Sequence, residues 1–130
     1  MENKSYYSDK IRAIDAKFEA QRIAFSPMTF QAIRALIELG LLQKISDSGD
    51  DGITIKELSA DSGISEYGVG VLAEMALGMG VLKINPAATD DESASGLGKL
   101  VLGKVGWFLL EDDLTKVNFN FTNDICYKEI

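Results

Sequence analysis

The apolar positions near the start of the chain repeat with the period of a helix. No Gly or Pro occurs between Ser5 and Ala24, so a single helix is expected over this segment. Its large apolar side chains recur at steps of three and four residues, which is the spacing of a seam between two packed helices. They are Tyr7, Ile11, Ile14 and Phe18, followed by Phe25 after a polar residue, Gln21, at the position between. Two interpretations stay open: the helix packs on its own domain, or the stripe is a seam between subunits.

A second helix is predicted directly after the first. Ser26 and Pro27 are typical of a helix start, with a side-chain cap followed by proline at the first helical position. The apolar pattern continues to Leu39, and Gly40 supplies a left-handed stop. Apolar residues fall on more than one side of this segment, so it is expected to be the central core helix. A short apolar turn (residues 41–45) and a polar loop then follow.

The middle of the chain predicts a helix-turn-helix. Thr54 and Glu57 have the spacing of a capping box and open a short helix that ends at Gly63. Ser65 caps a second and longer helix, which Gly80 closes. Two helices joined by a glycine turn, with the second one longer, form this motif.

Two short strands are predicted after the helix pair. Residues 81–84 form a compact apolar run that Asn85-Pro86 ends, and residues 99–102 form the returning strand. The polar loop between them, residues 87–98, is expected to be a wing. The predicted fold class is therefore mostly α with a small β-hairpin, arranged as a winged helix.

The last part of the chain is less regular. Residues 104–110 are too apolar for a surface loop, and apolar residues alternate with Asn over residues 117–121. Asn123 or Asp124 is expected to cap a helix that begins at residue 125. A helix that stops in its first turn indicates truncation, either of the expressed chain or of the gene product itself.

The composition of the chain excludes several kinds of catalytic and metal-binding site. The chain has 130 residues, 13 basic against 20 acidic side chains, a net charge of −7, no His and one Cys. These counts exclude a Ser-His-Asp triad, histidine metal sites, an internal disulfide and a multi-thiolate zinc site. No catalytic, cofactor-binding or metal-binding residue is predicted, and a binding or assembly module is favoured over a complete enzyme. The polar start and the absence of a long apolar run predict a cytoplasmic protein without a membrane partner.

Charge also weighs against DNA, the commonest partner of a winged helix. A recognition helix needs Lys, Arg, Asn or Gln to reach phosphates and base edges. Between Ser65 and Met79 none of these occurs, whereas Glu66 and Glu74 do. The wing has three acids and no base. No nucleic-acid partner is expected, and a winged-helix transcriptional regulator that binds DNA is kept as the alternative.

Several segments together resemble the N-terminal domain of class I S-adenosylmethionine-dependent methyltransferases, in particular the O-methyltransferases that act on small molecules. The resemblance lies in residues 30–42, 54–59 and 72–82, with residues 104–110 and 118–127 similar to the segment that leads toward the catalytic domain. It implies a winged helix that does not bind DNA, forms a homodimer and helps to cover the substrate pocket. It also implies that S-adenosylmethionine binds in a following doubly wound domain, so no cofactor is expected in this chain and its partners are a second copy and that catalytic domain.

The resemblance divides the chain into three parts and assigns residues to two surfaces. Residues 1–25 are expected to be a dimerisation helix, residues 26–103 the winged helix, and residues 104–130 the start of the connection to the catalytic domain. Trp107 and Phe108 are candidates for the wall of a substrate pocket. The candidate dimer interface comprises Tyr7, Ile11, Ile14, Phe18, Phe25 and Met28.

Overall fold

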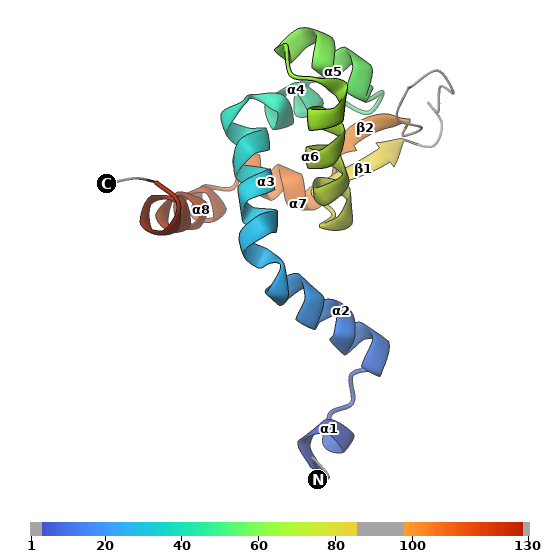
Figure 1. The fold of residues 1–130 in the computed structure, drawn as a ribbon, viewed down its shortest axis with the longest axis vertical. Helices are drawn as coiled ribbons and strands as arrows, with labels where there is room; N and C mark the ends of the chain where they lie inside the picture. Colours follow the sequence, from blue (N-terminus) through green and yellow to red (C-terminus); the bar gives the residue numbers. More distant parts are fainter. Residues whose placement is uncertain (1–3, 86–97, 129–130) are drawn as a thin grey trace.

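The computed structural model describes residues 4–85 and 98–128. Its elements in chain order are α1 (Lys4–Ser8), α2 (Ala13–Ala24), α3 (Ser26–Glu38), α4 (Leu41–Asp47), α5 (Ile55–Ser62), α6 (Glu66–Gly78), β1 (Leu82–Asn85), β2 (Lys99–Leu102), α7 (Lys104–Glu111) and α8 (Asp113–Cys126). Figure 1 shows a body built from α3 to α7, with α1 and α2 projecting from one end and α8 beside α3. We call α1, α2 and the link between them the arm.

One hydrophobic core holds the body together. It collects fully buried side chains from α3, α4, α5, α6 and both strands. The largest of them are Leu36, Leu41, Leu42, Ile45, Ile55, Leu58, Leu82 and Leu100. The predicted core helix is present as α3, which buries Ile33 and Leu36, whereas residues 41–47 form a helix, α4, rather than a short turn.

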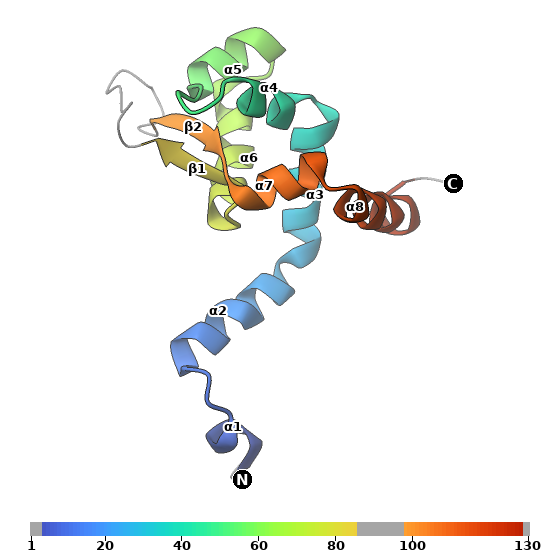
Figure 2. The same cartoon turned by 180° about the vertical axis from the view of Figure 1, so that it is seen from behind.

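The two strands pair antiparallel, as the sequence predicts. Leu82 lies opposite Leu102 and Ile84 opposite Leu100. Ile53 adds a bridge on the other side of Leu100, with N···O distances of 3.0 and 2.8 Å between the two backbones. Figure 2 shows the hairpin and α7 in front of α6, so the strands close one side of the body.

The predicted caps of the helix pair are present. The Thr54 hydroxyl accepts a hydrogen bond from the Glu57 amide at 3.1 Å, and the Ser65 hydroxyl accepts one from the Gly68 amide at 3.0 Å. Gly63 ends α5 with a φ of 76°, a left-handed conformation that glycine adopts without a steric penalty. The fold class, mostly α with a two-stranded antiparallel hairpin, is confirmed. The wing, residues 87–98, lies outside the described residues except for Gly98, so the winged helix stays a prediction.

The expectation of one helix from Ser5 to Ala24 is wrong. The chain leaves helical geometry between α1 and α2, where the Asp9 carboxylate accepts a hydrogen bond from the Ile11 amide at 2.9 Å. Such a local side-chain bond offers the backbone an alternative to the helix. Tyr7 therefore lies on α1 and Ile11 on the link, so neither shares a helix face with Ile14.

The junction of α2 and α3 also differs from the prediction. Ser26 does not cap α3; its hydroxyl donates a hydrogen bond to the Ile23 carbonyl at 2.8 Å. Only Phe25 separates the two helices, and its own amide still bonds to the Gln21 carbonyl at 2.9 Å. Helical hydrogen bonding thus continues almost through the junction, and the arm extends from the start of α3.

The last helix also differs from the prediction. α8 begins at Asp113 with Asp112 as its cap, so the expected cap at Asn123 or Asp124 is wrong, as is a helix interrupted in its first turn. The alternating residues 117–121 lie within this helix, where Phe119 is half-buried and Phe121, on the opposite face, is exposed. Phe119 stacks on Phe30 of α3 with ring centroids 4.4 Å apart, which fixes α8 against the body.

Candidate functional site

The arm exposes large apolar side chains that the body does not cover. No residue of α2 is buried, and Ile14 and Phe18 are 53% and 64% exposed. An isolated helix of 12 residues is only marginally stable in water. A helix whose apolar face stays exposed among the described residues of its own chain is typical of an element that packs on another molecule.

An apolar groove lies between this helix and the body. It has a volume of about 500 Å³ and runs between α2, the first turn of α3 and the second half of α6. Its apolar lining consists of Phe18, Phe25, Met28, Val71, Met75 and Met79. Long flexible Met side chains adapt to the shape of an inserted partner, so the groove is suited to receive an apolar helix face.

The structure brings together part of the predicted interface. Phe18, Phe25 and Met28 line the groove, and Ile14 lies one helical turn from Phe18 and is also exposed. Tyr7 and Ile11 are exposed as well but lie outside α2. We call the exposed apolar residues Ile14, Phe18, Phe25 and Met28 the arm stripe.

The contribution of α6 to this groove was missed from the sequence. The sequence predicts Val71, Met75 and Met79 as apolar positions of the second helix of the helix-turn-helix, with no interface role. In the structure Val71 is exposed, and Met75 and Met79 are half-buried. The available signal was the composition of α6, which carries apolar residues on most of its sides although one side faces solvent.

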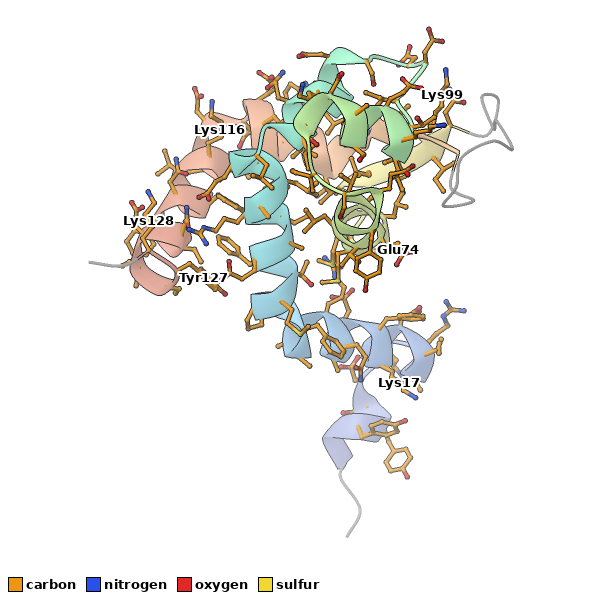
Figure 3. All side chains as sticks on the ribbon, turned by 45° about the horizontal axis from the view of Figure 1, so that its top comes forward. Lys17, Glu74, Lys99, Lys116, Tyr127 and Lys128 are labelled. Carbon is orange, nitrogen blue, oxygen red and sulfur yellow. The ribbon has the colours of Figure 1, made fainter. Side chains whose placement is uncertain are left out.

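Opposite charges lie at the edges of the groove. Arg22 of α2 pairs with Glu19 at 3.2 Å on the surface of the same helix. Glu74 of α6 also lines the groove, and its side chain is exposed. Figure 3 shows Glu74 near the end of α6 that faces α2, with Lys17 on the arm. An apolar floor with a charged rim is the usual composition of a protein interface.

Trp107 and Phe108 form a separate aromatic surface on α7. Their ring centroids are 5.0 Å apart with an interplanar angle of 83°, an edge-to-face contact. Both are partly exposed and line a hollow of about 680 Å³, together with Asp50 and Lys104. The structure therefore places both predicted residues at one hollow, which does not share a lining residue with the groove.

Two kinds of feature are not found among the described residues, a cluster of metal-binding side chains and a membrane-spanning helix. Across residues 4–85 and 98–128, no cluster of three or more His, Cys, Asp or Glu side chains has a geometry that holds a metal. Over the same ranges, every helix falls short of the length and hydrophobicity of a membrane span. Cys126, at the end of α8, is a free and exposed thiol.

Comparison with known families identifies the class of this domain. The family model of the Dimerisation2-like domain matches residues 17–90, a range that includes most of α2, the whole of α3 and α6, and therefore the groove. The chain belongs to this family, which comprises the dimerisation domains of O-methyltransferases. No curated protein matches the chain.

Proposed function

We propose that this chain forms the homodimer of a small-molecule O-methyltransferase, and that the arm stripe and the groove are the contact between subunits. The observation that carries the proposal is that α2 has no buried residue, although its apolar side chains lie beside an apolar groove within the matched range. Tyr7 and Ile11 are at most additions at the edge of this contact, because they do not share the face of α2.

The energetics support a subunit contact. Full burial of one large apolar side chain is worth about 1.5–3 kcal/mol, before the cost of association is subtracted. Phe18, Phe25 and Met28 are each more than half exposed, so most of this energy is not used within a single chain. The same reasoning predicts that one charge placed among them strongly weakens the dimer.

The charge on α6 favours a protein partner over DNA. The exposed first turn of α6 presents Glu66 and Tyr67, and the whole helix has no basic residue. Because affinity for DNA comes largely from Lys and Arg near phosphates, we take the winged helix as an assembly domain rather than a DNA reader. The cytoplasmic location expected from the sequence stays a prediction.

The proposal gives this domain a supporting role in catalysis. Trp107 and Phe108 would form part of the cover of the substrate pocket, since half-exposed aromatic rings at a hollow are suited to an apolar ligand. S-adenosylmethionine would bind in a separate doubly wound domain. The two-stranded antiparallel hairpin of the described residues supports this, because a doubly wound domain holds its cofactor at a loop between a parallel strand and a helix.

Sedimentation equilibrium tests the proposed dimer. The wild-type chain is expected to be a dimer at micromolar concentration, and Phe18→Glu is expected to raise the dimer dissociation constant at least 100-fold. Tyr67→Glu is the matched control, because Tyr67 is an exposed aromatic residue that does not line the groove. A wild-type monomer at high micromolar concentration, or a dimer that Phe18→Glu leaves unchanged, contradicts the proposal.

A further inference from the structure

α8 has two apolar faces, and the body covers only one of them. On the inner face, the rings of Phe119 and Tyr127 stack on Phe30 of α3, with centroids 4.4 and 4.9 Å apart. Asn123 lies between them in sequence and is only 5% exposed. The outer face consists of four apolar residues at steps of three, four and four, each more than 60% exposed: Leu114, Val117, Phe121 and Ile125. We call these four residues the outer stripe.

The outer stripe is a continuous apolar surface on the far side of α8 from α3. At 100° per residue its four members fall within one side of the helix, opposite Phe119 and Asn123. A continuous exposed stripe of this kind marks an interaction surface, whereas single exposed apolar residues do not. α8 lies beyond residues 17–90, so the family match does not include it.

We propose that the outer stripe of α8 packs against the arm stripe of a second copy of the chain, so that it forms the second half of the subunit interface. This inference rests on the proposed dimer and extends it to a surface that the family match does not cover. By two-fold symmetry each subunit would give one arm and one α8, which makes two equivalent contacts.

The position of α8 explains why the contact is between copies. α3 separates α8 from α6 and from the groove, as Figure 1 shows. Figure 3 shows the same separation from another direction, with Tyr127 and Lys128 on one side of α3 and Glu74 on the other. The outer stripe therefore faces away from the groove of its own chain.

The exposed area of the arm stripe alone is smaller than a standard subunit interface, which favours a second contact surface. The four side chains of the arm stripe expose on the order of 400 Å², whereas a standard interface buries about 800 Å² on each partner. The four residues of the outer stripe expose a similar area, and the two surfaces together reach the standard size. Both stripes consist of large aliphatic and aromatic residues, which pack on each other without leaving a polar group unpaired.

Charges beside the two stripes are complementary. Among the described residues, neither Lys17, next to Phe18 on the arm, nor Asp113, next to Leu114 on α8, takes part in an ion pair within the chain. Both side chains are exposed. A contact between the stripes brings these opposite charges to the rim, where they favour the correct alignment of the helices more than they add affinity.

Site-directed cross-linking between two tagged chains tests this contact. Both chains carry Cys126→Ser, which removes the native thiol; one also carries Gln21→Cys on the arm, and the other Asn118→Cys beside the outer stripe. We expect a short bismaleimide to join the two different chains. The control replaces Asn118→Cys with Lys56→Cys, an exposed position on α5, and is expected to give at least tenfold less product.

A second variant separates the failure of this inference from the failure of the proposed dimer. Phe121→Glu is expected to raise the dimer dissociation constant at least tenfold by sedimentation equilibrium, with an unchanged circular dichroism spectrum because Phe121 is exposed. If the chain dimerises, Phe18→Glu disrupts the dimer, and neither the cross-link nor a Phe121→Glu effect is found, the inference is wrong while the proposed dimer stands. A wild-type chain that stays monomeric overturns both.

Discussion

The body and the arm bury their apolar residues in opposite ways. In the body, Leu36, Leu42 and Leu82 are at most 1% exposed and contact several elements of the same chain. In the arm, Phe18 is 64% exposed, and α2 has no buried residue. Both regions are rich in apolar residues with helical spacing, so the difference lies in what covers them.

This difference separates folding from assembly. The body has a closed core and caps for its helices, which is what a domain needs to fold alone. The arm lacks a core, so its helical structure depends on whatever packs against the stripe. The body therefore provides the stability of the fold, and the arm provides the contact between subunits. Mutations placed in one region or the other test this division.

The largest effect is expected from a cavity in the body. Leu42→Ala removes a fully buried side chain from the centre of the core and should lower the free energy of unfolding by about 3 kcal/mol. Urea denaturation followed by circular dichroism measures this loss. Phe18→Ala is the matched change in the arm, and it should leave the unfolding of the dilute monomer nearly unchanged while it weakens dimerisation. If the two variants lose equal free energy of unfolding at low protein concentration, the arm packs into the core of its own chain and the prediction is wrong.

A smaller loss of stability is expected from a substitution where α7 approaches the hairpin. A Cβ atom added at Gly103 would clash with the Gly80 carbonyl oxygen. Because the backbone must move to relieve this clash, Gly103→Ala should lower the free energy of unfolding by about 1–3 kcal/mol. Gly70→Ala is the control, since its added Cβ would meet only the end of the Ile55 side chain at 4.0 Å. Because Gly70 lies inside α6, Gly70→Ala should raise the free energy of unfolding by about 0.5–1 kcal/mol. Thermal unfolding of both variants checks the prediction, and destabilisation by Gly70→Ala would contradict it.

The smallest effect concerns the pH dependence of α8. The Thr115 hydroxyl and amide donate hydrogen bonds to the Asp112 carboxylate at 2.7 and 3.0 Å, and they lower its pKa below the ordinary value of 3.8. Because the pKa is lower in the folded state, the carboxylate stabilises α8 fully above pH 3.8, and this contribution is lost as the pH falls through the folded-state value.

Helicity measured by circular dichroism between pH 7 and pH 2 tests the Asp112 cap. The wild-type chain should lose the contribution of Asp112 only at the acidic end, whereas Asp112→Asn should keep a cap whose strength does not change with pH. Subtracting the two titrations removes the effect of the other carboxyl groups. A difference that is constant over the whole range would show that the ionised carboxylate does not stabilise α8.

Much of the body could be predicted from the sequence because its signals are local. The Thr54 and Ser65 caps, the Gly40 and Gly63 stops and the two apolar strands each depend on a few neighbouring residues, and the structure contains all of them. The resemblance to the dimerisation domains of O-methyltransferases depended on the same region, and the family match confirms it.

The ends of the chain were predicted less well because their structure depends on bonds and contacts that a pattern does not contain. The spacing of Tyr7, Ile11 and Ile14 fits one helix, but the hydrogen bond at Asp9 interrupts it. The alternation around Phe119 fits a strand as well as a helix, and stacking on Phe30 shows which residues face inward. The groove needs α6 beside α2, a long-range contact that helical spacing alone does not predict.

Amide hydrogen exchange in α2, measured above and below the dimer dissociation constant, tests the central claim most directly. Since α2 has no buried residue in the single chain, its amides should exchange quickly in the dilute monomer and at least tenfold more slowly in the dimer. The amides of α3 should stay protected at both concentrations, because its core side is buried within the chain. Protection of α2 that does not change with concentration would contradict the account.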